Sequence, residues 1–410
     1  MSAIARSLAL AAVVAAAAPA LGGCGGRTVT HHLVDAVMAS AHRPAPPAPH
    51  PAGPPDPEAP GSRYLVLAGD LHCHVSPPDR PPHVTRGLAE TVALAREEKL
   101  DFVVLTPHLR APFFLSVEGR ARAVAGIGGL ARDVARLASG GPLFIVGFEY
   151  TDFDYGHVGA SFANLEEVLA AVSIEEAHRR PGRFFEEYVR RGGVLVINHP
   201  LLTPLPSVLP WASRDMSWTP FTAPGPYPAE VVAANQLAQG IEVFNLAIAE
   251  LRDRFLLFDL HASVRAVLAR ADREIVARGR RMTPVGGSDS HSGHLRATTF
   301  VLSEGRTREA IRDGLLAGRT CVRDPAACSL EVRAASGPWL PVGSSLQNVE
   351  MVHARARGEG IQILVNGHEY RPEAPGVPVT VPIEAGRCSV IRAVVGEGYS
   401  APIYANCPIQ

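Results

Sequence analysis

The feature that most constrains the fold is a repeated alternation of short apolar runs with longer amphipathic stretches, beginning near residue 64. The apolar runs have the length and composition of buried strands; they are Tyr64–Ala68, Phe102–Thr106, Leu143–Phe148, Val194–Ile197, Ile241–Phe244, Met282–Val285 and Thr298–Leu302. The stretches with helical periodicity are Ala89–Lys99, Arg120–Ala138, Arg183–Arg191 and Leu256–Arg278. Such alternation is typical of a parallel α/β architecture, and the number of repeats suits a barrel.

A second region begins after about Cys328, where short alternating segments with turn residues replace the helical pattern. The segments are Ser329–Ala334, Val349–Arg355, Ile361–Val365, Val377–Ile383 and Ser389–Val395. They predict a small antiparallel β domain. We therefore divide the folded part into an α/β barrel over residues 63–325 and a β domain over residues 326–410.

One stretch breaks the alternation. Leu201–Pro228 is rich in proline and contains Trp211, Trp218, Phe221 and Tyr227. Loops of this length are usually functional or disordered. Its aromatic side chains either form an apolar wall for a substrate or pack on the barrel rim, and the sequence leaves both readings open.

The N-terminus is typical of an export signal. Arg6 provides a positive charge, and an apolar run over Leu8–Leu21 is too short to span a bilayer comfortably. Leu21-Gly22-Gly23-Cys24 resembles the lipobox of bacterial lipoproteins, which implies a signal peptide over residues 1–23 and lipidation of Cys24. The alternative is an ordinary secretory signal with a coincidental cysteine. In either case we expect an exported protein; in the first it is lipid-anchored in a bacterial envelope, in the periplasm or at the outer surface.

The segment between this signal and the first strand is expected to act as a tether. From about Arg43 to Gly61 proline and alanine dominate and large apolar residues are few, a composition that stays extended and forms no core, and we assign the tether to residues 24–62. The formal net charge of −1 provides no basic field for nucleic-acid binding. We therefore expect a membrane attachment and no polymeric nucleic acid as a partner.

An exported chain allows disulfides. Cys321 with Cys328 and Cys388 with Cys407 are near neighbours in sequence, so these are the pairings that we favour, although spacing alone does not fix connectivity. Cys73 would then remain free.

The strongest chemical signal lies at the end of the first strand, in Asp70-Leu71-His72-Cys73-His74. Successive side chains of a strand point to opposite faces, so His72 and His74 share one face. Because the carboxyl ends of barrel strands form the mouth of the active site, two imidazoles there can coordinate a metal ion.

Further metal-binding side chains recur at the ends of later apolar runs. They are His108 after Thr106-Pro107, Glu149 after Phe148, His199 after Asn198, and Asp289 with His291 in Ser288-Asp289-Ser290-His291; His157 follows Glu149 on a glycine-flanked segment. One such residue is as readily a cap or a satisfied core residue as a ligand. The whole set predicts a metal centre.

This ordered series resembles the motifs of the polymerase and histidinol phosphatase (PHP) superfamily of metallohydrolases, over roughly Tyr64–Val322. The C-terminal part, ending in Ser400-Ala401-Pro402-Ile403-Tyr404, is similar to the subgroup that includes carbaryl-hydrolysing enzymes, the CehA/McbA group. The resemblance implies a distorted seven-stranded β/α barrel.

Carried onto this sequence, the resemblance also implies the ligand sets. One ion would be held by His72, His74, Glu149 and Asp289, and a second by Glu149, His157 and His199. His108 and His291 would hold a third ion with either Asp79 or His83; Pro107 departs here from the aspartate usual in the family. We interpret Asp70 and Asn198 as residues that orient the ligands, and expect the catalytic residues to be Glu149, Asp289 and His199.

This arrangement suits hydrolysis, because two cations roughly 3.5–4 Å apart acidify a bridging water and stabilise the attacking and leaving oxygens. The expected enzyme uses a metal-bridging hydroxide to cleave a small phosphomonoester or phosphodiester, or a carboxyl or carbamate ester. Its cofactors would be two or three divalent ions, and imidazole ligands suit Zn, Mn or Fe. Arg110, Arg319 and Arg323 are candidate ligands for an anionic substrate group.

Two other readings compete. A single-metal amidohydrolase-type enzyme also opens with His-x-His; the two-metal form needs a carbamylated lysine, and Lys99, the sole lysine, precedes the second strand. A catalytically inactive metal-binding lipoprotein that binds a ligand is the other. Such a protein would most naturally have lost part of the ligand set, which here is complete.

Overall fold

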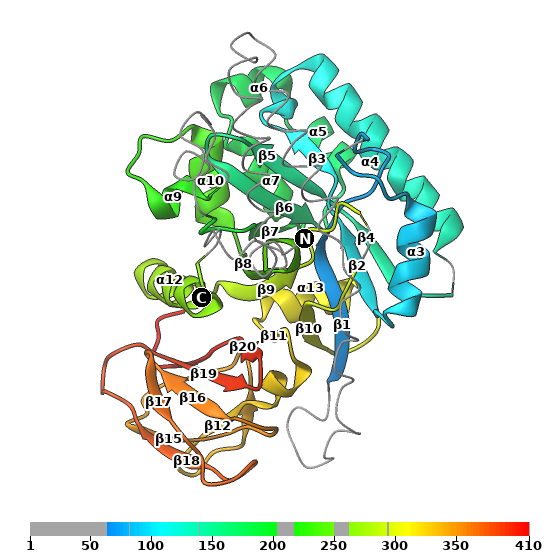
Figure 1. The fold of residues 1–410 in the computed structure, drawn as a ribbon. Helices are drawn as coiled ribbons and strands as arrows, with labels where there is room; N and C mark the ends of the chain where they lie inside the picture. The colour runs from blue at the N-terminus through cyan, green and yellow to red at the C-terminus, as the bar shows by residue number, and fades with distance from the viewer. Residues whose placement is uncertain are drawn as a thin grey trace, which may run out of the picture.

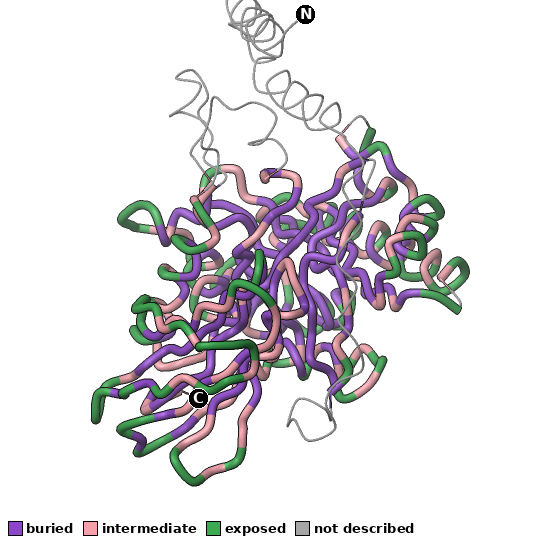
Figure 2. The backbone as a smooth tube through the Cα atoms, turned by 60° about the horizontal axis from the view of Figure 1, so that its bottom comes forward, coloured by how far each residue is buried: buried purple, intermediate pink, exposed green. Residues whose placement is uncertain are grey.

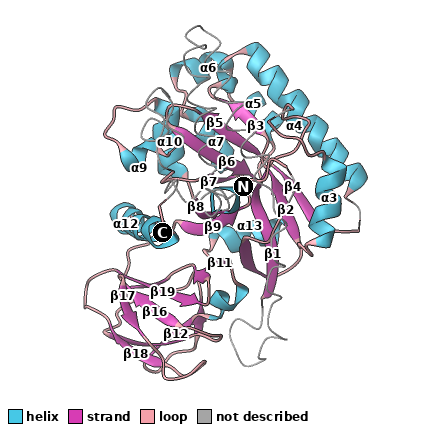
Figure 3. Ribbon diagram, in the orientation of Figure 1, coloured by secondary structure: helices cyan, strands magenta, loops and turns pink. Residues whose placement is uncertain are grey.

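The computed structural model describes residues 64–409 except 82, 139, 203–216, 250–261 and 293–294. The signal peptide, Cys24, the tether, Trp211 and the start of the Leu256–Arg278 stretch therefore lie outside the described residues. The fold is mixed α/β, with helices around central strands and a β-rich part at the C-terminal end (Figures 1 and 3).

The first sheet is centred on β1 (Leu65–Cys73). β1 pairs in parallel with β2 (Phe102–Leu105), which pairs in parallel with β4 (Leu143–Val146). On its other edge β1 pairs antiparallel with β10 (Thr299–Ser303), followed by β11 (Thr320–Val322). All four residues of β2 are buried, as its uninterrupted Phe-Val-Val-Leu run predicts for a strand covered on both faces.

The second sheet has the order β3 (His108–Arg110), β5 (Phe148–Asp152), β6 (Gly156–Ser161), β7 (Val194–Ile197), β8 (Gly240–Asn245) and β9 (Thr283–Gly287). β6 is antiparallel to both its neighbours, whereas β7, β8 and β9 are parallel. The parallel α/β architecture expected from the sequence is therefore only partly met in this sheet, because a tight turn after Asp152 returns the chain antiparallel along β5.

The two sheets meet at two places. At one, the end of β1 lies beside the end of β9, where Asp289 N donates to His72 O (2.8 Å) and His74 N donates to Ser290 O (3.1 Å). At the other, β2 and β4 run on into β3 and β5, and Glu149 N donates to Pro107 O. The expected closed seven-stranded barrel is not confirmed, because the pairings among the described strands form separate sheets.

Helices surround these strands, and Figure 2 shows buried strands inside and exposed residues mainly in outer loops and helices. They are α3 (Leu88–Glu97), α4 (Val117–Leu137), α5 (Leu165–Ala171), α6 (Ile174–Arg179), α7 (Arg183–Arg190), α9 (Thr219–Thr222), α10 (Ala229–Leu237), α12 (Val264–Arg278) and α13 (Arg308–Leu316). Several start at a capping side chain: Ser116 accepts from Gly119 N before α4, and Thr307 accepts from Ala310 N before α13. The helical stretches predicted from the sequence thus match α3, α4, α7 and α12 within a few residues, as far as they are described. None of the helices in the described ranges is long and apolar enough to cross a membrane.

The C-terminal part is built mainly of antiparallel strands, as predicted. One of its sheets contains β13 (Leu340–Pro341), β12 (Glu331–Ala334), β15 (Met351–Arg355) and β18 (Val379–Pro382). The other strands are β14 (Ser345–Leu346), β16 (Gln362–Val365), β17 (His368–Tyr370), β19 (Ser389–Val395), β20 (Gly398–Ser400) and β21 (Ile403–Ala405). These belong to the first sheet, because β20 pairs antiparallel with β11. One continuous sheet thus runs from β4 into the C-terminal part.

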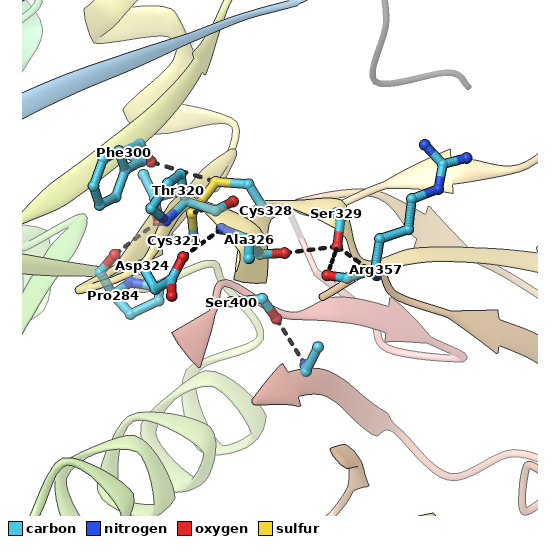
Figure 4. The surroundings of a disulfide bond; sticks show 12 residues. Pro284, Phe300, Thr320, Cys321, Asp324, Ala326, Cys328, Ser329, Arg357 and Ser400 are labelled. Carbon is cyan, nitrogen blue, oxygen red and sulfur yellow. Dashed lines mark hydrogen bonds between the residues drawn. A yellow bond between two sulfur atoms is a disulfide. The ribbon is translucent and has the colours of Figure 1, made fainter. Parts of the chain in front are cut away.

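The two disulfides favoured from the sequence are confirmed. Cys321–Cys328 joins β11 to the short 3-10 helix η4 (Pro325–Ser329), where the chain passes into the C-terminal strands (Figure 4). Cys388–Cys407 joins the segment before β19 to the chain end. Cys73 is free and buried.

The described part of the Leu201–Pro228 loop packs on the protein. Trp218 is fully buried and donates from Nε1 to Asn235 Oδ1 (2.9 Å), and Phe221 is 9% exposed. Tyr227 is half-buried and donates to Thr219 O. Of the two roles left open by the sequence, these three aromatic side chains fill the packing role.

Candidate metal centre

The end of β1 brings two imidazoles together. His72 and His74 are 1% and 0% exposed, and their Nε2 atoms lie 3.1 Å apart. Cys73, between them, points to the other face, where its Sγ accepts from Arg86 Nη2 (3.1 Å). The alternation of a strand thus produces the pair of imidazoles that the sequence predicts.

Glu149, at the start of β5, lies at the centre of the cluster. Its Oε1 lies 3.1 Å from His72 Nε2, 3.3 Å from His157 Nδ1 and 3.7 Å from His199 Nε2. Its Oε2 lies 3.3 Å from His108 Nε2. This buried carboxylate is therefore shared by four histidines from different strand ends, as a bridging ligand requires.

His157 reaches Glu149 because β6 is antiparallel to β5. Thr151 and His157 are register partners, so the hairpin returns His157 to the mouth beside Glu149. The sequence-based placement of His157 is therefore geometrically sound, although the direction of the strand was not anticipated.

Asp289 closes the other side of the cluster. Its Oδ1 lies 3.3 Å from His74 Nε2 and 3.4 Å from His72 Nε2. Asp289 and His199 both have positive φ angles, 49° and 27°. This conformation is uncommon for residues other than glycine and persists where surrounding contacts enforce it, as at many functional sites.

A further group contains His74, His108 and His291, whose ligand atoms lie within 4.8 Å of one another. His83 joins it, with its Nε2 3.3 Å from His108 Nε2 and its ring centroid 4.6 Å from that of His291. Asp79 instead lies behind the group, 3.2 Å from His74 Nδ1 and 3.1 Å from His108 Nδ1. Of the two candidates left open by the sequence, His83 is thus placed among the imidazoles and Asp79 orients them.

Asp70 and Asn198 contact the ligands as the sequence analysis proposed. Asp70 Oδ1 accepts from the backbone nitrogens of His72 (3.1 Å) and Ser288 (2.9 Å). Asn198 Nδ2 donates to Glu149 Oε1 (2.9 Å). Burial raises the pKa of Asp70 to about 6, although these hydrogen bonds by themselves lower the pKa.

Three neighbours of the cluster were missed by the sequence analysis. Glu242 on β8 is 1% exposed and contacts His72, and Asn245 beside it donates to Asp289 Oδ2 (3.1 Å). Arg86 is 1% exposed and donates to Ser290 Oγ (2.8 Å) and Ser292 O (3.1 Å), which ties the loop after β9 to the end of β1. A charged residue inside an apolar run, such as Glu242 in Ile241–Phe244, was the available signal.

The pKa values of the cluster are shifted because carboxylates and imidazoles lie close together. Burial raises the pKa of Glu149, but the neighbouring histidines lower it more strongly. The pKa of Glu149 is therefore well below its usual range. The balance is similar for Asp289, where His72 is the largest opposing influence. Burial lowers the pKa of His72, but Asp289, Glu242 and Glu149 together raise it well above its usual value. The carboxylates are thus held ionised and positive charge is favoured among them.

The donor set fits divalent metal ions. Three groups could each hold an ion: His74, His108 and His291; His72, His74 and Glu149; and Glu149, His157 and His199. The Nε2 atoms of His72 and His74 face each other at 3.1 Å, where two unprotonated nitrogens would repel unless a cation or a proton lies between them. Buried imidazoles and carboxylates are the ligands that Zn, Mn and Fe accept.

The three candidate arginines lie in different places. Arg110 is exposed on β3, two residues beyond His108, with its guanidinium 5.9 Å from the Phe153 ring centre. Arg319 is not brought to the cluster, because its guanidinium lies over Tyr64, at the opposite end of β1 from His72. Arg323 lies over Phe244 and forms an ion pair with Glu397.

No protein-family model and no protein of curated function matches the chain. Solved structures do match. A two-domain protein from Bacteroides vulgatus, containing a predicted PHP-like metal-dependent phosphoesterase, is 16% identical, with 87% of this chain and 99% of that chain covered and a TM-score of 0.43. A protein from Bifidobacterium adolescentis assigned as a metal-dependent phosphoesterase is 14% identical (62% and 96% covered, TM-score 0.33). PsfC from Pseudomonas syringae is 18% identical (61% and 88% covered, TM-score 0.35).

Proposed function

We propose that this chain is a metal-dependent hydrolase of the PHP type that cleaves small phosphoesters. The observation that supports this most directly is the carboxylate of Glu149, which is buried, belongs to two of the three candidate metal groups and also lies beside His108 of the third. A carboxylate shared in this way would serve as a ligand to two cations at once. Two such ions, of Zn, Mn or Fe, acidify water and neutralise negative charge on attacking and leaving oxygens when they are bound.

Different residues would bind the different ions. His72, His74, Glu149 and Asp289 would hold one ion, and Glu149, His157 and His199 a second. His83, His108 and His291 would hold a third. Asp79, Glu242 and Asn198 bond to these ligands from behind and keep them aimed at the centre.

Arg110 favours an anionic substrate. It shares a face of β3 with His108, is exposed, and has no carboxylate partner in the described parts of the chain. Its guanidinium can therefore donate hydrogen bonds to a phosphoryl oxygen of such a substrate. A neutral carboxyl or carbamate ester would make no use of this charge.

We also propose that the two sheets around the cluster are halves of one distorted barrel. The main-chain bonds between β1 and the segment after β9, and the passage of β2 into β3 and β4 into β5, bring the strand ends to one mouth. Such a mouth at the carboxyl ends of strands is where barrel enzymes place their chemistry.

The two-metal form of the amidohydrolase alternative is disfavoured by geometry, and the single-metal form is left to the metal-content test below. Lys99 follows α3 and precedes β2, so it lies at the opposite end of β2 from His108 and cannot form a carbamylated bridge in the cluster. For the exported, lipid-anchored state we keep Cys24 as the proposed attachment point, on its sequence pattern alone.

The test combines metal content with turnover. Purified metal-free protein would be reconstituted with Mn, Zn or Fe, measured by elemental analysis, and assayed on p-nitrophenyl phosphate, bis-p-nitrophenyl phosphate and p-nitrophenyl acetate. We expect at least two ions per chain and turnover of a phosphate ester that His157→Ala abolishes. His368→Ala, an exposed histidine on β17, serves as the matched control and should keep both.

Three results would contradict the proposal. One ion or none would favour the single-metal rival, and metal binding without turnover would favour the inactive binding protein. Turnover of the acetate alone would assign the site to carboxyl esters.

A further inference from the structure

We infer that Glu242 is the positioning residue that couples the two candidate metal groups, fixing the proton position of His72 and the backbone of His199 at once. This inference rests on the proposed metal-dependent function. Glu242 lies within β8, is 1% exposed, and carries no feature of the ligand motifs recognised in the sequence.

The first oxygen of Glu242 acts on His72. Oε1 lies 3.1 Å from His72 Nδ1. A carboxylate only accepts hydrogen bonds, so this contact requires a proton on Nδ1. A neutral imidazole has one N–H, and Nε2 is therefore left with its lone pair facing Glu149, Asp289 and His74. This is the tautomer that binds a cation through Nε2.

The second oxygen restrains His199 directly and Asp289 through Asn245. Oε2 accepts from the backbone nitrogen of His199 (2.7 Å) and from Asn245 Nδ2 (3.2 Å). The bond to His199 restrains a residue whose φ of 27° is unfavourable without support. Asn245 also donates to Asp289 Oδ2 (3.1 Å), so the restraint extends to the carboxylate of the first group.

The chain makes room for this contact. A Cβ atom on Gly287 would lie 2.2 Å from Glu242 Oε1 and 2.4 Å from His72 Cβ. A glycine is thus needed at the end of β9 for Glu242 and His72 to approach each other. Asp79 performs the corresponding task for the other histidines, through the Nδ1 atoms of His74 and His108.

Glutamine cannot replace this residue, although its shape is almost the same. A carboxamide has one accepting oxygen and one donating nitrogen, whereas both oxygens of Glu242 accept. If the nitrogen faces His72, the imidazole must shift its proton to Nε2 and lose its ligand atom. If it faces His199 N, two donors oppose each other. Either orientation damages one metal group.

The experiment measures the binding of Mn and of Zn to metal-free protein by titration calorimetry. Partners of this kind typically contribute roughly 10–100-fold in metal affinity, and we expect a loss of that size in Glu242→Gln. The matched control is Glu331→Gln, another buried glutamate, which is paired with Arg355 in the C-terminal strands and should bind metal like the wild type. Thermal melting of the metal-free variants separates this effect from a general loss of stability.

The outcomes are distinct. Wild-type protein that binds no metal would refute the proposed function rather than this inference. Equal metal affinity in wild type and Glu242→Gln would overturn the inference while leaving the function intact. If Glu242→Gln does not fold, Asn245→Ala tests the same restraint through Asp289; a weaker metal affinity supports the inference, and an unchanged one overturns it.

Discussion

The most direct test of the metal cluster is Glu149→Gln. The substitution keeps the size of the side chain and its hydrogen bond from Asn198, which lies 2.9 Å from Oε1. It removes one negative charge from a site where Oε1 and Oε2 lie 3.1–3.7 Å from four imidazole nitrogens. The change is therefore mainly electrostatic.

Its magnitude follows from Coulomb's law. A unit charge pair separated by about 4 Å contributes about 4 kcal/mol at an effective dielectric constant near 20. Because about 1.4 kcal/mol is a factor of ten in affinity, and a divalent ion interacts more strongly than a unit charge, the loss of one full charge weakens the binding of a neighbouring cation by at least about three powers of ten. The second group depends more on Glu149, because its other ligands, His157 and His199, are both neutral when they bind metal. We expect this ion to be lost first and turnover to fall by orders of magnitude.

The assay is elemental analysis after reconstitution, followed by turnover of the best phosphate ester. His83→Ala is the comparison, because His83 contacts the third group through His108 and His291. We expect it to cost much less than Glu149→Gln. Full metal content and near-normal turnover in Glu149→Gln, with loss in His83→Ala, would refute the reasoning and move the essential ions to the third group.

Further predictions cover pH, packing, processing and domain structure. Burial lowers the pKa of His74, but Asp289 and Asp79 raise this pKa to about 9. The protonated His74 therefore stabilises the metal-free protein fully below pH 6.5, and this stabilisation is lost as the pH rises towards 9. The melting temperature of the metal-free protein should fall between these pH values, and a constant melting temperature would refute the assignment. Gly287→Ala should lower metal affinity, because its Cβ would collide with Glu242, and calorimetry would detect this. Cys24→Ser should abolish processing and membrane retention, as fractionation and apparent mass would show. Removal of residues 326–410 should leave insoluble protein in sedimentation assays, because the β11 edge loses its partner; a soluble, metal-binding fragment would contradict this.

Most of the metal cluster could be predicted from the sequence. Most candidate ligands, though not His157 or His83, follow an apolar run, and the ends of neighbouring strands meet in space, so His72, Glu149 and Asp289 converge for a reason visible in the pattern. Sequence proximity was also sufficient for the two disulfides.

The rest depended on contacts between distant segments. Glu242 is separated from His72 by most of the α/β part, and nothing in its local sequence marks a partner. The choice between Asp79 and His83 required the position of His108, which only the folded chain provides. β6 was missed as a strand because Gly156–Ser161 contains two glycines and no uninterrupted apolar run, and its antiparallel pairing with β5 is visible only in the folded chain.

The pairing of β1 with β10 sets the order in which this protein can assemble. β1 is among the first folded residues to be synthesised, yet Gly69 pairs with Thr299 and the cluster needs both His72 and His291. Such long-range pairing folds slowly, since the chain between the partners must be ordered before the contact forms. In a small zinc domain the metal drives folding. In this chain, by contrast, nearly the whole α/β part must fold before the candidate ligand side chains are brought together. Under the proposed function, metal loading would therefore be a late step, and the supply of ions in the compartment where folding finishes would decide which metal the site acquires.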